Sequence, residues 1–184
     1  MKTVVHELVE DDFTRRDVPE FGLPETEYGN ALDNLVQANV DVIVHTAESA
    51  ILLGYRKDVP LRGMLWAFGG RMNRGESVAD AATRALAREL GLNHVGRDRL
   101  LLDNVYNVMW GTRSIPPEER GFQTLLMLVK YECTEQEAAE FTAADQTHQW
   151  VRWYPPGEIR ALHAAGSGLI HPFLPIVLSN AGLY

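Results

Sequence analysis

Apolar residues along the chain fall into short runs that are separated by polar turns. Six runs are apolar throughout or alternate with polar residues, which is the pattern of β-strands. They occupy residues 38–46, 50–56, 64–68, 104–110, 123–133 and 149–154. A turn at residues 47–49 joins the first two runs, so we expect them to form a pair of strands.

One segment has the period of a helix instead of a strand. Its apolar residues recur every four positions, which places them on one face of a helix. This stripe consists of Val78, Ala82, Leu86 and Leu90. Ser77 is a favourable N-cap, Asp80 follows three residues later near the positive end of the helix, and Gly91 is a favourable C-terminal stop. We therefore predict a helix between residues 77 and 91.

The order of these elements predicts an α/β fold with a mixed sheet and helices packed on its faces. A short helix is expected within residues 25–37, and another over 155–165, which has prolines in its first turn. Residues 1–34 are interpreted as an N-terminal extension, 35–164 as the main domain and 165–184 as a C-terminal helix for packing or oligomerisation. This tail is short and contains prolines, so it does not predict a membrane span.

Composition and charge limit the partners of the protein. The 184 residues allow one ordinary domain, and the net charge of −8 disfavours duplex nucleic acid and anionic membranes. Residues 56–99 have the opposite, positive net charge, with nine basic and five acidic residues. Such a segment suits a small polyanion such as a nucleotide, although scattered solvated arginines explain it as well. A single cysteine, Cys133, excludes an internal disulfide, and the acidic start is no secretory signal, so we expect a cytoplasmic protein.

The segment from Gly69 to the helix carries the candidate chemistry. Two glycines after a strand let the backbone approach a ligand closely and free carbonyl groups for a metal. On the following helix, Ala85, Arg88 and Glu89 share one face. Carboxylates at all three positions would bind several Mg²⁺ ions. Here Glu89 is the one acid of the three, and Arg88 adds a positive charge that repels a cation.

The same segment resembles the Nudix box, whose pattern is G-x5-E-x7-R-E-U-x-E-E-x-G-U with U a bulky aliphatic residue. The matching residues are Gly70, Glu76, Arg84, Leu86, Glu89, Gly91 and Leu92. Ala85 and Arg88 depart from the pattern, which has glutamate at both positions. The resemblance identifies the chain as a member of the Nudix hydrolase family. It implies an α/β/α sandwich with a mixed sheet and the Nudix loop and helix.

One branch of this family, the GDP-mannose mannosyl hydrolases, lacks the same two glutamates. Similarity to that branch implies a hydrolase of a nucleotide sugar that uses one Mg²⁺ ion, with Mn²⁺ as an alternative. Water then attacks the anomeric carbon, and the products are the sugar and a nucleoside diphosphate. The resemblance covers about residues 36–160.

The resemblance assigns roles to individual residues. His148, in DQTHQWVRWY, matches the general base, Arg56 and Arg71 match arginines that bind the diphosphate, and Asp41 matches an aspartate that stabilises or binds the sugar. The plain alternatives are a surface histidine for His148 and a turn residue for Asp41.

The implied metal ligands are Gly70, Glu89 and Thr147. Thr147 departs from the branch, which has glutamine at this position. The resemblance gives Glu76 and Arg84 a structural role, with Arg84 bracing the loop of Glu76. A pairing of Arg84 with Asp80, four residues earlier on the helix, is the alternative.

Three functions remain open from the sequence. The first is the nucleotide-sugar hydrolase just described. The second is a pyrophosphatase that attacks phosphorus with acids recruited from elsewhere, for which Glu118 and Glu119 are candidates. The third is a degenerate domain that binds a nucleotide or a protein as a sensor. In each case we expect a small-molecule nucleotide as ligand, and the apolar tail and the N-terminal extension suggest a homodimer.

Overall fold

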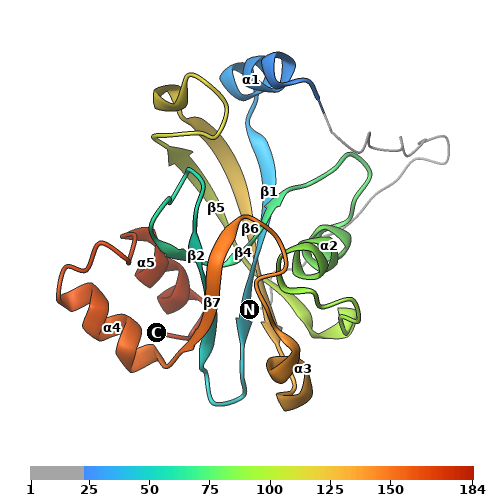
Figure 1. The fold of residues 1–184 in the computed structure, drawn as a ribbon. Helices are drawn as coiled ribbons and strands as arrows, with labels where there is room; N and C mark the ends of the chain where they lie inside the picture. The colour runs from blue at the N-terminus through green and yellow to red at the C-terminus, as the bar shows by residue number, and fades with distance from the viewer. Residues whose placement is uncertain (1–22) are drawn as a thin grey trace.

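The computed structural model describes residues 23–184 as one mixed sheet with helices on both faces (Figure 1). Residues 1–22 of the predicted extension lie outside the described part of the chain. The strands are β1 (Gln37–His45), β2 (Ile51–Arg56), β3 (Leu65–Trp66), β4 (Phe68–Arg71), β5 (Leu100–Trp110), β6 (Phe122–Glu132) and β7 (His148–Tyr154). The helices are α1 (Glu25–Asn34), α2 (Val78–Leu90), α3 (Glu135–Glu140), α4 (Pro156–Ala164) and α5 (Phe173–Asn180), with short 3-10 turns η1 (Arg97–Arg99) and η2 (Glu118–Arg120).

Strand β1 lies in the middle of the seven-stranded sheet. The main path has the order β3-β2-β1-β6-β5, while β4 pairs with β1 and β7 pairs with β2. Strands β1 and β6 are parallel, and the other pairs are antiparallel. Because one parallel pair sits among antiparallel ones, the predicted mixed sheet is confirmed.

The strand predicted at residues 64–68 is divided into two. Its first part, β3, pairs with β2, and its second part, β4, pairs with β1 and extends to Arg71. The chain therefore changes partner strand at Ala67, which hydrophobicity along the sequence does not indicate. Helix α3 was not predicted, although Thr134 and Glu137 form a reciprocal capping box at its start.

Helix α2 follows the prediction closely. The Ser77 hydroxyl accepts a hydrogen bond from the backbone N–H of Asp80, whose carboxylate in turn accepts one from the N–H of Ser77. At the other end Gly91 has φ of 74°, a left-handed conformation that glycine adopts without strain. The four residues of the predicted apolar stripe are buried against the sheet. This fixes the register of the helix and therefore the direction of Glu89.

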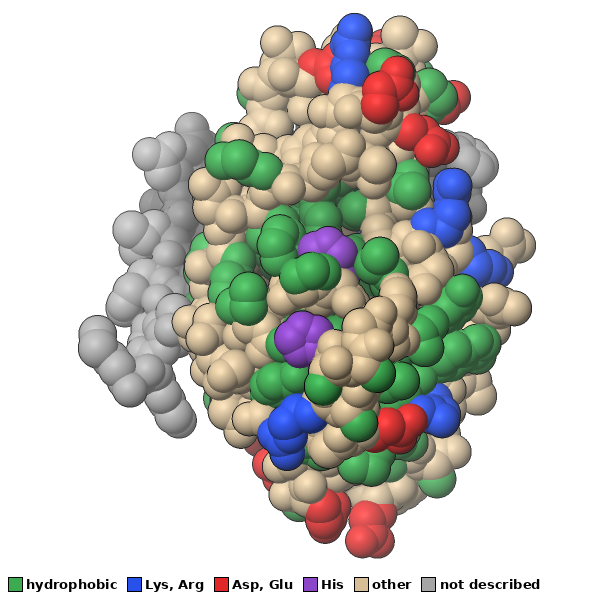
Figure 2. Space-filling model, turned by 90° about the vertical axis from the view of Figure 1, so that its left-hand side faces the viewer, with side chains coloured by type: hydrophobic (Ala, Val, Ile, Leu, Met, Phe, Trp, Pro, Cys, Tyr) green, Lys and Arg blue, Asp and Glu red, His purple; other side chains and the backbone are tan. Residues whose placement is uncertain are grey.

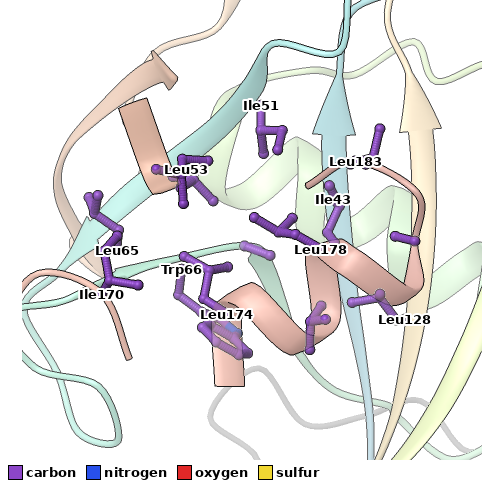
Figure 3. Packing of buried hydrophobic residues seen from close by; sticks show 14 of the residues in the cluster. Ile43, Ile51, Leu53, Leu65, Trp66, Leu128, Ile170, Leu174, Leu178 and Leu183 are labelled. Atoms are coloured by element: carbon purple, nitrogen blue, oxygen red, sulfur yellow. The ribbon is translucent and has the colours of Figure 1, made fainter. Parts of the chain in front are cut away.

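Two hydrophobic cores lie on opposite faces of the sheet. One joins α2 to the sheet, and the other joins α5 to it (Figures 1 and 3). In the second core Leu178 of α5 lies beside Ile43 of the central strand β1, and Leu174 lies beside Trp66 (Figure 3). Full burial of a leucine side chain contributes about 1.5–3 kcal/mol. Helix α5 therefore packs on the sheet, and the predicted α/β class is confirmed.

Within residues 23–184, every helix is too short or too polar to cross a bilayer.

Candidate functional site

The centre of the candidate site is a pair of buried side chains, Glu89 from α2 and His148 from the start of β7. Their exposed fractions are 0% and 2%. The Nδ1 atom of His148 lies 3.7 Å from Oε2 of Glu89, just beyond hydrogen-bonding distance. Among the described residues, neither ring nitrogen of His148 has a hydrogen-bond partner. A buried polar group without a partner is rare in a folded protein, so this ring is a strong candidate for a functional group.

Burial shifts the pKa values of both groups towards their neutral forms. Desolvation, helped by the positive charge of Arg56, lowers the pKa of His148 to about 4. Desolvation raises the pKa of Glu89 to about 7, against the opposing effect of Arg88. His148 is therefore neutral at pH 7.

The guanidinium of Arg88 lies directly against this pair. It donates a hydrogen bond to Oε1 of Glu89, and its Nη2 donates another to the carbonyl oxygen of Gly69 at 3.0 Å. Its Nε lies 3.4 Å from Oδ2 of Asp145. The N–H of Gly69 also donates to Oε2 of Glu89 at 3.3 Å. Three oxygen atoms from three separate segments therefore converge on one cation, the side chain of Arg88.

Asp41 and Arg56 are strand neighbours of residues in this cluster: Asp41 of β1 pairs with Gly69 of β4, and Arg56 of β2 pairs with His148 of β7. Asp41 is buried, and one of its carboxylate oxygens accepts a hydrogen bond from Nε1 of Trp66 at 2.7 Å. Burial raises the pKa of Asp41, against the opposing effects of Trp66 and Arg56. The charge of Arg56 acts on Asp41, Glu89 and His148 together, while its Nε donates to the carbonyl of Pro60 at 3.1 Å.

The other residues predicted to bind the metal or the diphosphate are Thr147, Arg71 and Gly70. Thr147 donates its hydroxyl proton to Asp145 at 2.9 Å, and so it joins the cluster through that carboxylate. The guanidinium of Arg71 lies over the ring of Tyr28 in α1, with 4.5 Å between its central carbon and the ring centroid. Its predicted contact with a diphosphate stays a prediction. The carbonyl that accepts a hydrogen bond from Arg88 is that of Gly69, one residue before the predicted ligand Gly70.

A family model of the NUDIX domain matches residues 35–173. The chain belongs to the Nudix family. The predicted membership of the Nudix hydrolases, and with it the prediction of an enzyme, is confirmed. Nudix hydrolases act on small-molecule nucleotide substrates and generally use divalent metal ions.

The individual relatives have low sequence identity to this chain. The low-salt glycan biosynthesis protein Agl8 of Haloferax volcanii is 30% identical over 90 residues, which are 49% of this chain and 57% of Agl8. The match therefore spans little more than half of that relative's length.

Two solved structures illustrate the shared fold. A Nudix hydrolase of Nitrosomonas europaea has a TM-score of 0.55 and 15% identity, over 80% of this chain and 89% of its own. A bifunctional NMN adenylyltransferase/ADP-ribose pyrophosphatase of Francisella tularensis, in complex with AMP and a Mn ion, has a TM-score of 0.57 and 20% identity, over 84% of this chain and 46% of its own. At these identities the likeness shows the fold.

Two Nudix-box residues hold the loop before α2. The Nε and Nη2 atoms of Arg84 bond the two carboxylate oxygens of Glu76 at 2.6 and 2.8 Å, and Nη2 also bonds the carbonyl of Arg71. The backbone N–H of Asn73 donates to Glu76 at 2.7 Å. The alternative partner of Arg84, Asp80, pairs with Arg97 instead. A two-pronged arginine–carboxylate contact of this kind fixes both orientation and distance.

Replacing Arg84 with alanine is expected to lower the free energy of unfolding by about 1–2 kcal/mol, because Glu76 is 5% exposed and loses its main partner. Burial raises the pKa of Glu76, but the hydrogen bonds from Arg84 and Asn73 outweigh it and the net shift is downward. The stabilisation is therefore present above the ordinary pKa of glutamate and is lost as the pH falls below it. Urea unfolding at pH 7 and at about pH 3.5 measures this difference.

The matched control for this prediction is Arg97→Ala. It removes an arginine from an exposed pair with Asp80 and should change stability by less than about 1 kcal/mol. An equal loss of unfolding free energy in the two variants at pH 7 would show that the contact between Arg84 and Glu76 stabilises the fold no more than an exposed ion pair does.

An apolar cavity of about 320 Å³ lies on the α5 side of the sheet. Its walls include Trp66, Trp110 and Phe173. Figure 2 views this side of the molecule, where hydrophobic side chains gather around a histidine near the middle of the face. Because Trp66 bonds Asp41 with its indole N–H, one wall of the cavity is connected directly to the candidate site. Trp110 forms another wall.

The residues fit one divalent cation and do not fit a cluster of several. Among residues 23–184, no three His, Cys, Asp or Glu side chains are grouped so that they could hold a metal ion. Glu89, Asp145 and the carbonyl of Gly69 are nevertheless hard oxygen donors that already converge on a cation. Magnesium needs only one or two carboxylates when the substrate's phosphates supply further oxygens.

Sequence reasoning missed two of these donors, Gly69 and Asp145. The signal for Asp145 was present, since it stands three residues before His148 in a segment already singled out. The choice of Gly69 over Gly70 needed the pairing of β4 with β1, which determines where each carbonyl points.

Proposed function

We propose that this Nudix hydrolase cleaves a nucleotide sugar by attack of water at the anomeric carbon, with a nucleoside diphosphate as the leaving group. The observation that carries this proposal is the composition of the α2 face. Glu89 is its one acid, with Ala85 and Arg88 beside it, and a neutral buried histidine, His148, lies 3.7 Å away. This arrangement suits a base that acts on water and does not suit a multi-metal centre.

Attack at carbon makes different demands from attack at phosphorus. Attack on a diphosphate needs strong neutralisation of the phosphoryl oxygens, which other members achieve with clustered glutamates and metal ions. Departure of a diphosphate from a sugar leaves positive charge on the ring and negative charge on the leaving group. His148 would take the proton of the attacking water, because it is neutral at pH 7 and its ring nitrogens have no protein partner in the described chain.

The charged residues around His148 match these demands. Arg56 and Arg71 would hold the diphosphate, and Asp41 would stabilise the positive charge on the sugar or bind its hydroxyl groups. A Mg²⁺ or Mn²⁺ ion held by Glu89 and neighbouring oxygens, with Gly70 and Thr147 as further candidates, would add positive charge beside the diphosphate. The aromatic cavity beside Trp66 would receive the nucleobase, since planar bases stack on aromatic rings.

The names of two relatives support a nucleotide sugar as the class of substrate. The name of Agl8 places it in glycan biosynthesis, where activated sugars are handled. The Francisella protein is described as an ADP-ribose pyrophosphatase and is bound to AMP, and ADP-ribose is also a nucleoside diphosphate joined to a sugar. The second relative equally favours cleavage within the diphosphate, which is the main alternative.

The pyrophosphatase alternative needs acids near Glu89 that the α2 face does not provide. The candidates named from sequence, Glu118 and Glu119, lie in or beside η2, and the carboxylate of Glu118 lies 3.8 Å from Arg62. That position gives no contact with Glu89 among the described interactions. A binding module without catalysis is the third alternative. The predicted homodimer and the predicted cytoplasmic location stay predictions.

The deciding experiment is hydrolysis in ¹⁸O-water, followed by phosphorus NMR and mass spectrometry of the sugar. GDP-mannose, GDP-glucose, ADP-ribose and a dinucleoside polyphosphate are incubated with the protein, with and without Mg²⁺. We expect unlabelled nucleoside diphosphate and labelled sugar from at least one nucleotide sugar. This result places the attack at carbon, because the oxygen of water then stays with the sugar.

Two other results would contradict the proposal. Label in the phosphate of a nucleoside monophosphate means attack at phosphorus and a pyrophosphatase. No turnover of any substrate, with nucleotide binding retained in calorimetry, means a binding module.

A further inference from the structure

The side chain of Arg88 occupies the place in which a cation would sit. Its guanidinium bonds Glu89 and the carbonyl of Gly69 at 3.0 Å, and its Nε lies 3.4 Å from the carboxylate of Asp145. These oxygens come from α2, from β4 and from the loop before β7. They are also the hard oxygen donors that would bind a divalent ion. A metal ion and this guanidinium cannot use the same oxygens at the same time.

Electrostatics explains why the side chain of Arg88 occupies this position. Glu89 is fully buried, and a buried carboxylate without a positive partner is strongly unfavourable. The Nudix pattern has a glutamate at residue 88, so arginine there changes the local charge by two units and supplies its own cation. Arginine is suited to this because its planar fork presents several donors in fixed directions.

We propose that Arg88 is an internal cation that occupies the metal position between Glu89, Gly69 and Asp145, and that a divalent ion binds there only by displacing it. The Arg88 side chain is 44% exposed while Glu89 is fully buried, so the arginine has room to move away into solvent and the glutamate has not. Arg88 thus sets the affinity of the site for metal. This goes beyond the proposed function and holds whichever bond of the substrate is cleaved.

The test is a direct measurement of Mn²⁺ binding in the absence of substrate. The free ion is followed by electron paramagnetic resonance while the full-length protein is titrated. Arg88→Ala is expected to lower the Kd for Mn²⁺ at least tenfold compared with the wild type. Arg88→Gln, which keeps a donor for Gly69 without the charge, should show the same direction. The double variant Arg88→Ala/Glu89→Gln should lose this gain, because the main acidic ligand is gone.

A control separates displacement from a general loss of positive charge. Lys57 is exposed, and its charge also acts on His148. Lys57→Ala should therefore tighten Mn²⁺ binding by no more than about twofold, since an exposed charge is screened by solvent. An unchanged or weaker affinity in Arg88→Ala and Arg88→Gln overturns the proposal, and so does an equal gain in Lys57→Ala.

Thermal unfolding gives a second readout that does not depend on catalysis. Without metal, Arg88→Ala should unfold at a lower temperature than the wild type, because Glu89 is left buried without a cation. Millimolar Mn²⁺ should restore much of this loss in the variant and shift the wild type less. If the ion stabilises both proteins equally, Arg88 does not compete with it and the proposal fails. Since neither readout involves turnover, failure here is distinguishable from failure of the nucleotide-sugar reaction.

Discussion

Replacing His148 with alanine is expected to lower kcat by about two to four orders of magnitude, the usual contribution of a positioned general base. The fold should survive, because the variant removes a ring whose nitrogens have no protein partner in the described chain, and this offsets part of the lost packing against Phe68. If His148 is the base proposed above, the KM for the nucleotide sugar should change much less than kcat, since the imidazole would act on water and not on the nucleotide. Initial rates with the substrate identified by ¹⁸O labelling measure both constants.

Two further measurements separate a base from a structural residue. Free imidazole should restore part of the turnover of His148→Ala, because the variant leaves space for a small base beside Glu89. His94→Ala, which changes an exposed histidine, should keep the wild-type rate. Wild-type turnover in His148→Ala, or a loss that tracks the fraction of unfolded protein and is not rescued, would remove His148 from the mechanism.

The parts of this fold that were predictable are those that local sequence determines. Helix α2 has its cap at Ser77, its stop at Gly91 and a stripe with a period of four, and each of these acts within a few residues. The strands followed from apolar runs in the same way. The division of residues 64–68 between two partner strands was not predictable, because it depends on which strands lie on either side of Ala67.

The same distinction applies to the site. Features set by spacing within one helix were predictable, and contacts between segments far apart in the sequence were not. The spacing of the Nudix box places Ala85, Arg88 and Glu89 on one face of α2, so the shortage of carboxylates was visible in the sequence. That Arg88 turns back onto Gly69 and Asp145 was not visible, because the three segments meet only in the folded sheet. The burial of His148 was likewise hidden, since its neighbours in sequence are polar.

The second large effect is expected from a substitution of Gly54, in the middle of β2. Glycine in the interior of a strand is unfavourable, so its presence there needs an explanation. A Cβ atom on Gly54 would overlap the ring of His148 at Cδ2 and would lie 2.7 Å from Nε2. The glycine therefore provides the space in which the imidazole of His148 sits beside Glu89. Its role follows from the pairing of β2 with β7.

Gly54→Ala is expected to lower the free energy of unfolding by about 1–3 kcal/mol, as overpacking of a buried site does. It should also lower kcat nearly as much as His148→Ala, because the ring can remain in place only if the strands separate. The control is Gly157→Ala in α4, where an added Cβ meets open space and stability should be unchanged or slightly higher. Urea unfolding and initial rates on the same preparations measure the two effects.

The double variant Gly54→Ala/His148→Ala tests the cause. If the penalty of Gly54→Ala comes from the imidazole, then the same substitution made in His148→Ala should cost less than about 0.5 kcal/mol, because the ring is already absent. The two single losses are then strongly non-additive. Additive losses would mean that alanine at residue 54 disturbs the β2 backbone itself, and the glycine would have no connection with the position of the base. Non-additivity would instead show that the absence of a side chain at residue 54 determines the position of the His148 imidazole.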